Sequence, residues 1–187
     1  MKETKIKFAL VSLISFFCIA LLFTFSANAQ RRDHLSEMES ELVREAQEID
    51  RRSEIFVKAI DRRFLVLNND TSQSKKVEKD SAKWGELPKG TRVQLLLDIE
   101  KIIQEAIDNI DNLAARDMKS ELVPRAIHIL GDASARFLPQ LKSQLSQTNT
   151  EIEKGAILGA IDSCNQIIEA SAKTPKEDLK KKKQKDN

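Results

Sequence analysis

Apolar side chains recur at intervals of three and four residues along most of this 187-residue chain, and this spacing constrains its fold more than any other feature. Residues at such intervals line one face of an α-helix, whereas a half-buried strand needs alternation at every second residue. Tyr is absent, and only five Gly and four Pro are present, so typical strand and turn residues are scarce. The pattern predicts an all-α fold.

The first predicted helix covers residues 34–67, with Asp33 as its N-cap. At 1.5 Å per residue it would be about 50 Å long, a nearly straight, coiled-coil-like helix that packs on a bundle. Its apolar stripe consists of Leu35, Met38, Leu42, Ala46, Ile49, Phe56, Ile60, Phe64 and Leu67.

Residues 68–90 form the longest non-helical stretch, which we interpret as a loop with some helix around 75–83. A second helix is predicted over 91–115, because Thr91 followed three residues later by Gln94 forms a capping box ahead of a continuous apolar stripe.

A third helical region over 120–145 contains Gly131 and Pro139, which predict a kink or a break. The last helix is predicted over 150–171 and ends before Thr174-Pro175. About four helices joined by short connections, the first of them long, favour an antiparallel helical bundle.

An alternative for the third region is a repeat architecture. The stretch LVPRAIHILGD from Leu122, followed by FLPQL from Phe137, resembles the helix-turn-helix of a single HEAT-like repeat. A solenoid buries its core only by stacking several such units, so one copy favours the bundle.

Residues 1–29 have the composition of a signal peptide. Three early lysines precede an uncharged apolar run over 8–27, and Ala27-Asn28-Ala29 is a small-x-small cleavage site. A run of this length could also remain uncleaved as a membrane anchor. In both cases the lysines keep the N-terminus cytoplasmic. The sequence therefore predicts an exported protein, periplasmic or extracellular, or alternatively one anchored to the membrane by residues 8–27.

The remainder of the chain divides into a predicted domain and a lysine-rich tail. Residues 30–172 are long enough for a single helical domain. Residues 173–187 contain seven lysines and are expected to form a disordered basic tail that could contact anionic lipid or an acidic envelope polymer. Nucleic acid is not an expected partner, because the protein is exported and no aromatic residues interleave with the lysines to stack on bases.

Paired arginines form the sharpest internal pattern. Ile49-Asp50-Arg51-Arg52 recurs eleven residues later as Ile60-Asp61-Arg62-Arg63. Eleven residues make three helical turns, so the two copies share one face about 16 Å apart. Arg51, Arg52, Arg62 and Arg63 could bind a lipid headgroup, an anionic polymer or the carboxylates of a partner. The structural alternative is that they flank the core as a solvated helix face.

Trp84 is the one tryptophan and lies in the turn-rich segment between Lys83 and Lys89. It could belong to a membrane-interface or peptide-binding surface. Alternatively, its ring packs the long loop onto the helices.

Other polar groups carry weaker signals. Glu105, Asp108 and Asp111 gather oxygen ligands on one helix, but they lack the glycine-turned loop of calcium sites. His34 and His128 belong to no recognisable metal or catalytic motif. Cys164, placed on an inward helix face, is expected in the core.

We therefore predict a non-catalytic binding or structural protein of the cell envelope, with no catalytic, cofactor-binding or metal-binding residues. The alternative is a small-ligand or metal carrier with a site inside the bundle. Expected partners are a protein or an anionic envelope component, with peripheral membrane contact or a homodimer as further hypotheses.

Overall fold

The computed structural model describes residues 33–69, 74–117 and 119–175. The chain separates into two units, Met1–Asp33 and His34–Asn187. The helices of the described residues belong to the second unit. The predicted signal peptide over 1–29 and the tail beyond Pro175 lie outside the described residues.

Helices make up the regular structure of the described residues, and no strand occurs among them, so the all-α prediction is confirmed. The expected number of about four helices is wrong, since the described residues form six. They are α2 (Glu37–Glu45), α3 (Ile49–Leu67), α4 (Ser74–Trp84), α5 (Arg92–Arg116), α6 (Leu122–Ser146) and α7 (Glu151–Lys173).

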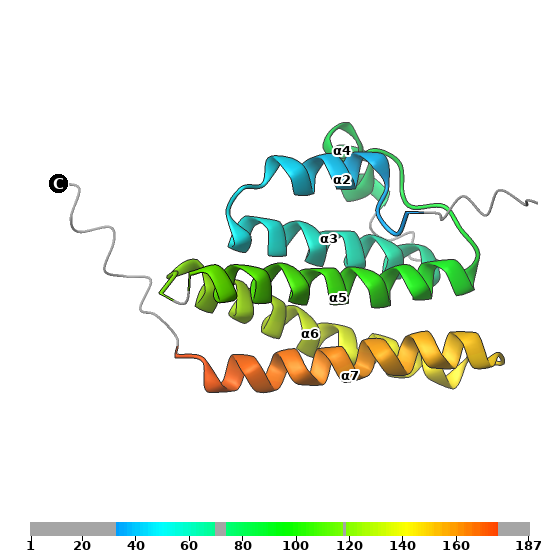
Figure 1. The fold of residues 1–187 in the computed structure, drawn as a ribbon. Coiled ribbons are helices and arrows are strands. Elements are labelled where there is room, and N and C mark those ends of the chain that lie inside the picture. Colours follow the sequence, from blue (N-terminus) through cyan, green and yellow to red (C-terminus); the bar gives the residue numbers. More distant parts are fainter. Residues whose placement is uncertain (1–32, 70–73, 118, 176–187) are drawn as a thin grey trace, which may run out of the picture. The chain divides into compact units, whose positions relative to one another are not determined.

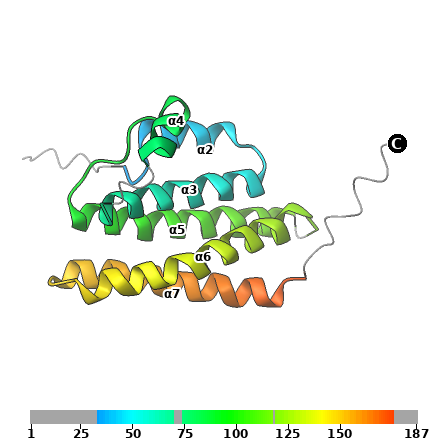
Figure 2. The ribbon, with the colours of Figure 1, turned by 180° about the vertical axis from the view of Figure 1, so that it is seen from behind.

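Four of these helices enclose the core. α3 packs on α5 and α6, and α7 packs on the same two helices, so α3 and α7 lie on opposite sides of the pair. Figures 1 and 2 show that α3 and α5, α5 and α6, and α6 and α7 each run in opposite directions. The core between them includes Phe56, Ile60, Phe64, Ile99, Ile103, Leu130, Phe137, Leu141, Ile157 and Cys164. Burial of such a side chain contributes about 1.5–3 kcal/mol.

The single first helix predicted over residues 34–67 is wrong. The helix ends at Glu45 and restarts at Ile49, with extended backbone angles at Ala46 and Glu48. The Arg52 guanidinium donates hydrogen bonds of 3.1 and 2.8 Å to the Ala46 carbonyl oxygen, which satisfies an acceptor left open at the end of α2. The break lets α2 fold back along α3 (Figure 1).

The start of α2 also differs from the prediction. Ser36, not Asp33, is the N-cap: its hydroxyl accepts from the Glu39 N–H, and the Glu39 carboxylate accepts from the Ser36 N–H. This reciprocal capping box turns Glu39 inward. Met38, expected in the apolar stripe, is 44% exposed.

The segment 68–90 contains α4, as the expected helix around 75–83 implied. Gly85 follows α4 with φ +66°, a left-handed conformation that favours glycine at the end of a helix. The Thr91 capping box with Gln94 is confirmed at the start of α5.

α6 is one helix through Gly131 and Pro139, so neither the predicted break nor the turn of a HEAT-like unit occurs there. Pro139 lacks the N–H that would bond the Ala135 carbonyl, and Figure 2 shows α6 changing direction along its length. At Gly131, a Cβ atom would lie 2.6 Å from the Ser171 side chain. Glycine therefore permits α6 and α7 to approach closely.

Cys164 lies in the core on α7, as predicted. Burial raises the pKa of its thiol to about 11, although a hydrogen bond with the Ser134 side chain offsets part of the rise. The thiol is therefore protonated at neutral pH and is a poor nucleophile.

None of the helices in the described part of the chain combines the length and hydropathy that a membrane span requires.

Candidate functional site

Among the residues that the structure describes, the largest group of buried charges lies where α2 packs on α3. The Glu39 carboxylate accepts from Arg62 Nε at 3.1 Å and from the Arg63 Nη1 and Nη2 atoms at 3.0 and 2.8 Å. Arg63 Nη2 also donates to the His34 carbonyl oxygen at 2.5 Å, and its Nε lies 3.7 Å from Asp98 Oδ2 on α5. We call Glu39, Arg62, Arg63 and Asp98 the buried ion cluster; its two positive and two negative side chains balance.

Burial and ion pairing act in opposite directions on this cluster. Burial alone would raise the pKa of Glu39, but hydrogen bonding to Arg63, the charges of both arginines and the Ser36 N–H together hold it below its usual value. Burial lowers the pKa of Arg62, and the Glu39 carboxylate offsets part of that effect. Glu39 is therefore ionised at neutral pH, and its charge is needed by two guanidinium groups that are almost inaccessible to solvent.

Arg62 also attaches the end of α4 to α3. Its Nη2 donates to the carbonyl oxygen of Trp84 at 3.1 Å, with further hydrogen bonds to the Gly85 and Glu86 carbonyls. The guanidinium carbon lies 5.8 Å from the centroid of the Trp84 ring, within cation–π range. Trp84 is 9% exposed, so its ring packs against α3 here and offers little area to a partner.

The first arginine pair is placed differently. Arg51 is exposed and lies 3.6 Å from the Glu54 carboxylate one helical turn away. Arg52 is half-buried: it donates to the Asn109 side chain on α5 at 2.8 Å in addition to the Ala46 carbonyl. Arg51 is thus the member of the repeat that presents its guanidinium to solvent.

The eleven-residue spacing correctly relates Arg51 to Arg62 and Arg52 to Arg63 along α3. The two pairs differ in what packs over them. α2 and the segment 84–86 lie over Arg62 and Arg63. In the first pair, Arg52 meets α2 at its C-cap, Ala46, and Arg51 is exposed. The structure therefore does not bring the four arginines together as one exposed surface.

Glu39 was absent from the sequence-derived candidates. Two signals could have identified it: Ser36-x-x-Glu39 is a capping-box motif, and Leu35, Glu39 and Leu42 share one helix face. A carboxylate within an apolar stripe predicts a buried partner of opposite charge.

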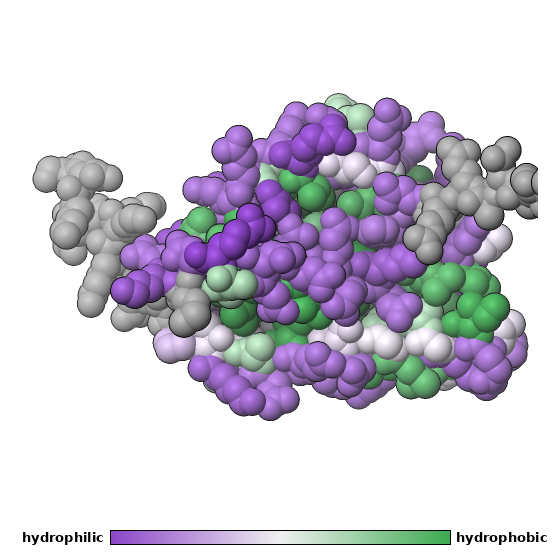
Figure 3. Space-filling view, viewed as in Figure 1, coloured by the Kyte–Doolittle hydropathy of each residue, from purple (hydrophilic) through white to green (hydrophobic). Residues whose placement is uncertain are grey.

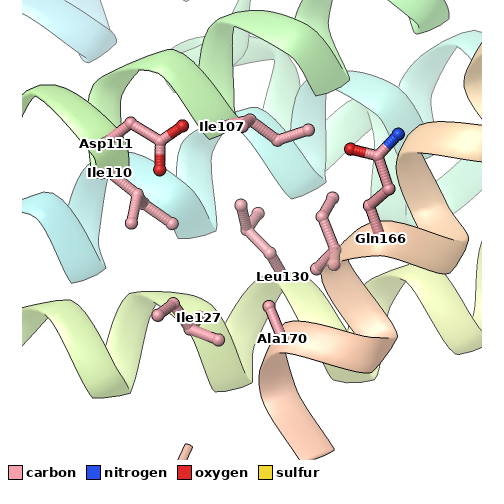
Figure 4. A pocket seen from close by; sticks show the side chains of 8 residues that line it. Ile107, Ile110, Asp111, Ile127, Leu130, Gln166 and Ala170 are labelled. Atoms are coloured by element: carbon pink, nitrogen blue, oxygen red, sulfur yellow. The ribbon is translucent and has the colours of Figure 1, made fainter. Parts of the chain in front are cut away.

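A second candidate site is a pocket of about 240 Å³ between α5, α6 and α7, which we call the α5–α6–α7 pocket (Figure 4). Its inner surface is apolar, and two polar side chains, the Asp111 carboxylate and the Gln166 amide, lie at its edge. In Figure 3, hydrophobic residues are visible in the seam between α5 and α7, with hydrophilic residues on both sides. The pocket is lined by Ile107, Ile110, Asp111, Ile127, Leu130, Gln166, Ile167 and Ala170.

The remaining polar candidates are engaged individually. His34 Nε2 lies 2.6 Å from the Glu105 carboxylate, and His128 Nδ1 lies 2.9 Å from the Ser171 hydroxyl. Asp108 accepts from the Gln104 amide at 2.9 Å. Among the residues that the structure describes, no three His, Cys, Asp or Glu side chains come close enough to hold a metal ion.

Comparison with protein-family models, with curated proteins and with solved structures finds no match for this chain.

Proposed function

We propose that this protein is an exported, non-catalytic binding protein of the cell envelope, whose helices form a bundle with a small-ligand site in the α5–α6–α7 pocket. The supporting observation is the lining of that pocket, which combines apolar side chains with two polar groups, the usual composition of small-molecule sites. Its volume of about 240 Å³ is below the roughly 300–1,000 Å³ of pockets for drug-sized ligands. It exceeds the roughly 150 Å³ that accommodates benzene. The pocket thus suits a small ligand.

A partner-binding role for the arginine repeat is the weaker proposal. Arg62 and Arg63 are 2% and 1% exposed and already bind Glu39, so an external anion would have to displace α2 to reach them. Arg51 alone would give a partner one solvated charge, and such a contact contributes little affinity.

A pocket-filling substitution tests the small-ligand function. We expect Ala170→Phe to block the α5–α6–α7 pocket, because Ala170 lines its edge and is exposed enough to accept a larger side chain. The measurement is thermal unfolding of the purified protein with a panel of small apolar compounds. A compound at ten times its Kd should raise Tm by about 3–6 °C in the wild type and leave the variant unchanged.

Ala135→Phe is the matched control, since Ala135 is exposed on α6 and lies outside the lining. It should respond to the same compounds as the wild type. Equal stabilisation of the wild type and Ala170→Phe would place ligand binding elsewhere and contradict the proposed site.

Export is proposed from the sequence. Lysines ahead of the apolar run over 8–27, followed by Ala27-Asn28-Ala29, favour translocation and cleavage after Ala29. We expect the intact mass of the natively expressed protein to correspond to a chain that begins at Gln30. A full-length mass in the membrane fraction would instead support the uncleaved anchor, and a full-length mass in the cytoplasm would contradict export.

A further inference from the structure

We infer that the α5–α6–α7 pocket binds a small organic ammonium ion, with the apolar part of the ligand inside the pocket and the charged nitrogen at Asp111 and Gln166. This inference rests on the proposed function and specifies the ligand class of the same site.

The inner part of the pocket is preformed by side chains of the core. Ile110, Leu130 and Ile167 are only 6%, 4% and 8% exposed, and they come from three different helices. Ile127 and Ala170 extend the apolar lining toward solvent. Packing between helices holds this surface in place, so an alkyl or aryl group can enter without rearrangement of the core.

Two hydrogen-bond acceptors stand at the edge of the pocket. The Asp111 carboxylate is exposed, and within the described residues no ion pair neutralises it. Gln166 Nε2 donates to Asp162 Oδ2 at 2.7 Å, so this bond orients the amide and leaves its oxygen as an acceptor. Figure 4 shows the Asp111 carboxylate and the Gln166 amide oxygen both directed toward the space between them.

The Asp111 carboxylate and the Gln166 amide oxygen favour a positively charged ligand over a neutral or negative one. A carboxylate ligand would be repelled by Asp111 and would meet no basic side chain in the described lining. A neutral alcohol could donate one hydrogen bond without gaining an ion pair. An ammonium group supplies positive charge and several N–H donors for the two acceptors. A bare divalent cation fits poorly, because the lining offers it a single carboxylate.

Three probes of equal chain length separate these alternatives: hexylammonium, 1-hexanol and hexanoate, titrated into the purified protein and followed by NMR chemical shifts. We expect hexylammonium to bind about fivefold more tightly than 1-hexanol, which is the gain from an exposed ion pair of about 1 kcal/mol. Hexanoate should bind most weakly. The preference for hexylammonium should shrink at high salt, since the ion pair is screened.

The variant that isolates the charge is Asp111→Asn, which should reduce hexylammonium affinity about fivefold and leave 1-hexanol affinity unchanged. Asp132→Asn removes an exposed carboxylate on α6 outside the lining and should change neither value. The ammonium assignment is overturned if hexylammonium binds the wild type no more tightly than 1-hexanol does and Asp111→Asn changes neither affinity. The small-ligand function would still stand in that case. If no probe binds, and Ala170→Phe behaves as the wild type does, both proposals are overturned.

Discussion

Glu39→Gln is expected to destabilise the fold by about 3–5 kcal/mol, because it removes the carboxylate that pairs with Arg62 and Arg63 while leaving both buried. Glutamine can still accept from the Ser36 N–H, since the capping box tolerates either side chain. The substitution therefore tests the charge and not the helix cap. The measurement is the midpoint of urea unfolding and the free energy extrapolated from it.

Two further variants sharpen this test. Glu41→Gln removes a half-exposed carboxylate that pairs with Arg44 in the same helix and should change stability by less than about 0.5 kcal/mol. Replacing Glu39, Arg62, Arg63 and Asp98 together with Met or Leu should be less harmful than Glu39→Gln, because no member of the buried ion cluster is then left without its partner. An unfolding midpoint of Glu39→Gln equal to that of the wild type would contradict the claim that the two buried arginines need the Glu39 charge.

Lowering the pH should weaken the interaction of Glu39 with Arg62 and Arg63 in the wild type and so reduce its folding stability. The pKa of Glu39 is lower in the folded chain than its usual value of 4.5, so the unfolded chain binds more protons as the pH falls below that value. The stability that Glu39 contributes is present above about pH 4.5 and is lost as the pH falls through the folded pKa. Glu39→Gln should lack this part of the acid dependence.

Phe137→Ala should cost about 3–5 kcal/mol, the usual range for removing a buried aromatic ring. Phe137 is 2% exposed on α6, and its ring centroid lies 5.7 Å from that of Phe64 on α3. The substitution would leave a cavity between the two helices. Urea unfolding at neutral pH measures the loss.

The control for this variant is Ile152→Ala, because Ile152 is a large apolar side chain that is 63% exposed. It should change stability by no more than about 0.5 kcal/mol. A double-mutant cycle with Phe64→Ala should give a coupling of about 0.5–1.5 kcal/mol for the ring pair. A loss below about 1 kcal/mol for Phe137→Ala would be inconsistent with a close-packed contact between α3 and α6.

The reliable predictions from the sequence are those that depend on residues close together in the chain. The Thr91 and Gln94 capping box lies within one turn, and the apolar stripe that follows it repeats every three or four residues. The end of α7 before Pro175 has the same local origin, because proline cannot continue a helix. Burial of Cys164 followed from its position among isoleucines on one face.

The candidate site was less predictable. The helical spacing of Leu42, Ala46 and Ile49 continues across the break between α2 and α3, and no Gly or Pro marks it. The repeat correctly placed the two arginine pairs along one helix, but the cover over Arg62 and Arg63 comes from α2 and from the end of α4. The α5–α6–α7 pocket needed the packing of three helices whose lining residues are up to 63 positions apart, from Ile107 to Ala170.

The sequence by itself determined the all-α fold, the start of α5, the end of α7 and the apolar faces, because backbone hydrogen bonding and capping act within a few residues. Tertiary structure decided which polar residues became buried. A guanidinium on α3 is a solvated surface group or a buried one according to whether another helix supplies a carboxylate over it. For Arg51 nothing from α2 does so, and for Arg63 the carboxylate is Glu39, 24 residues earlier in the chain.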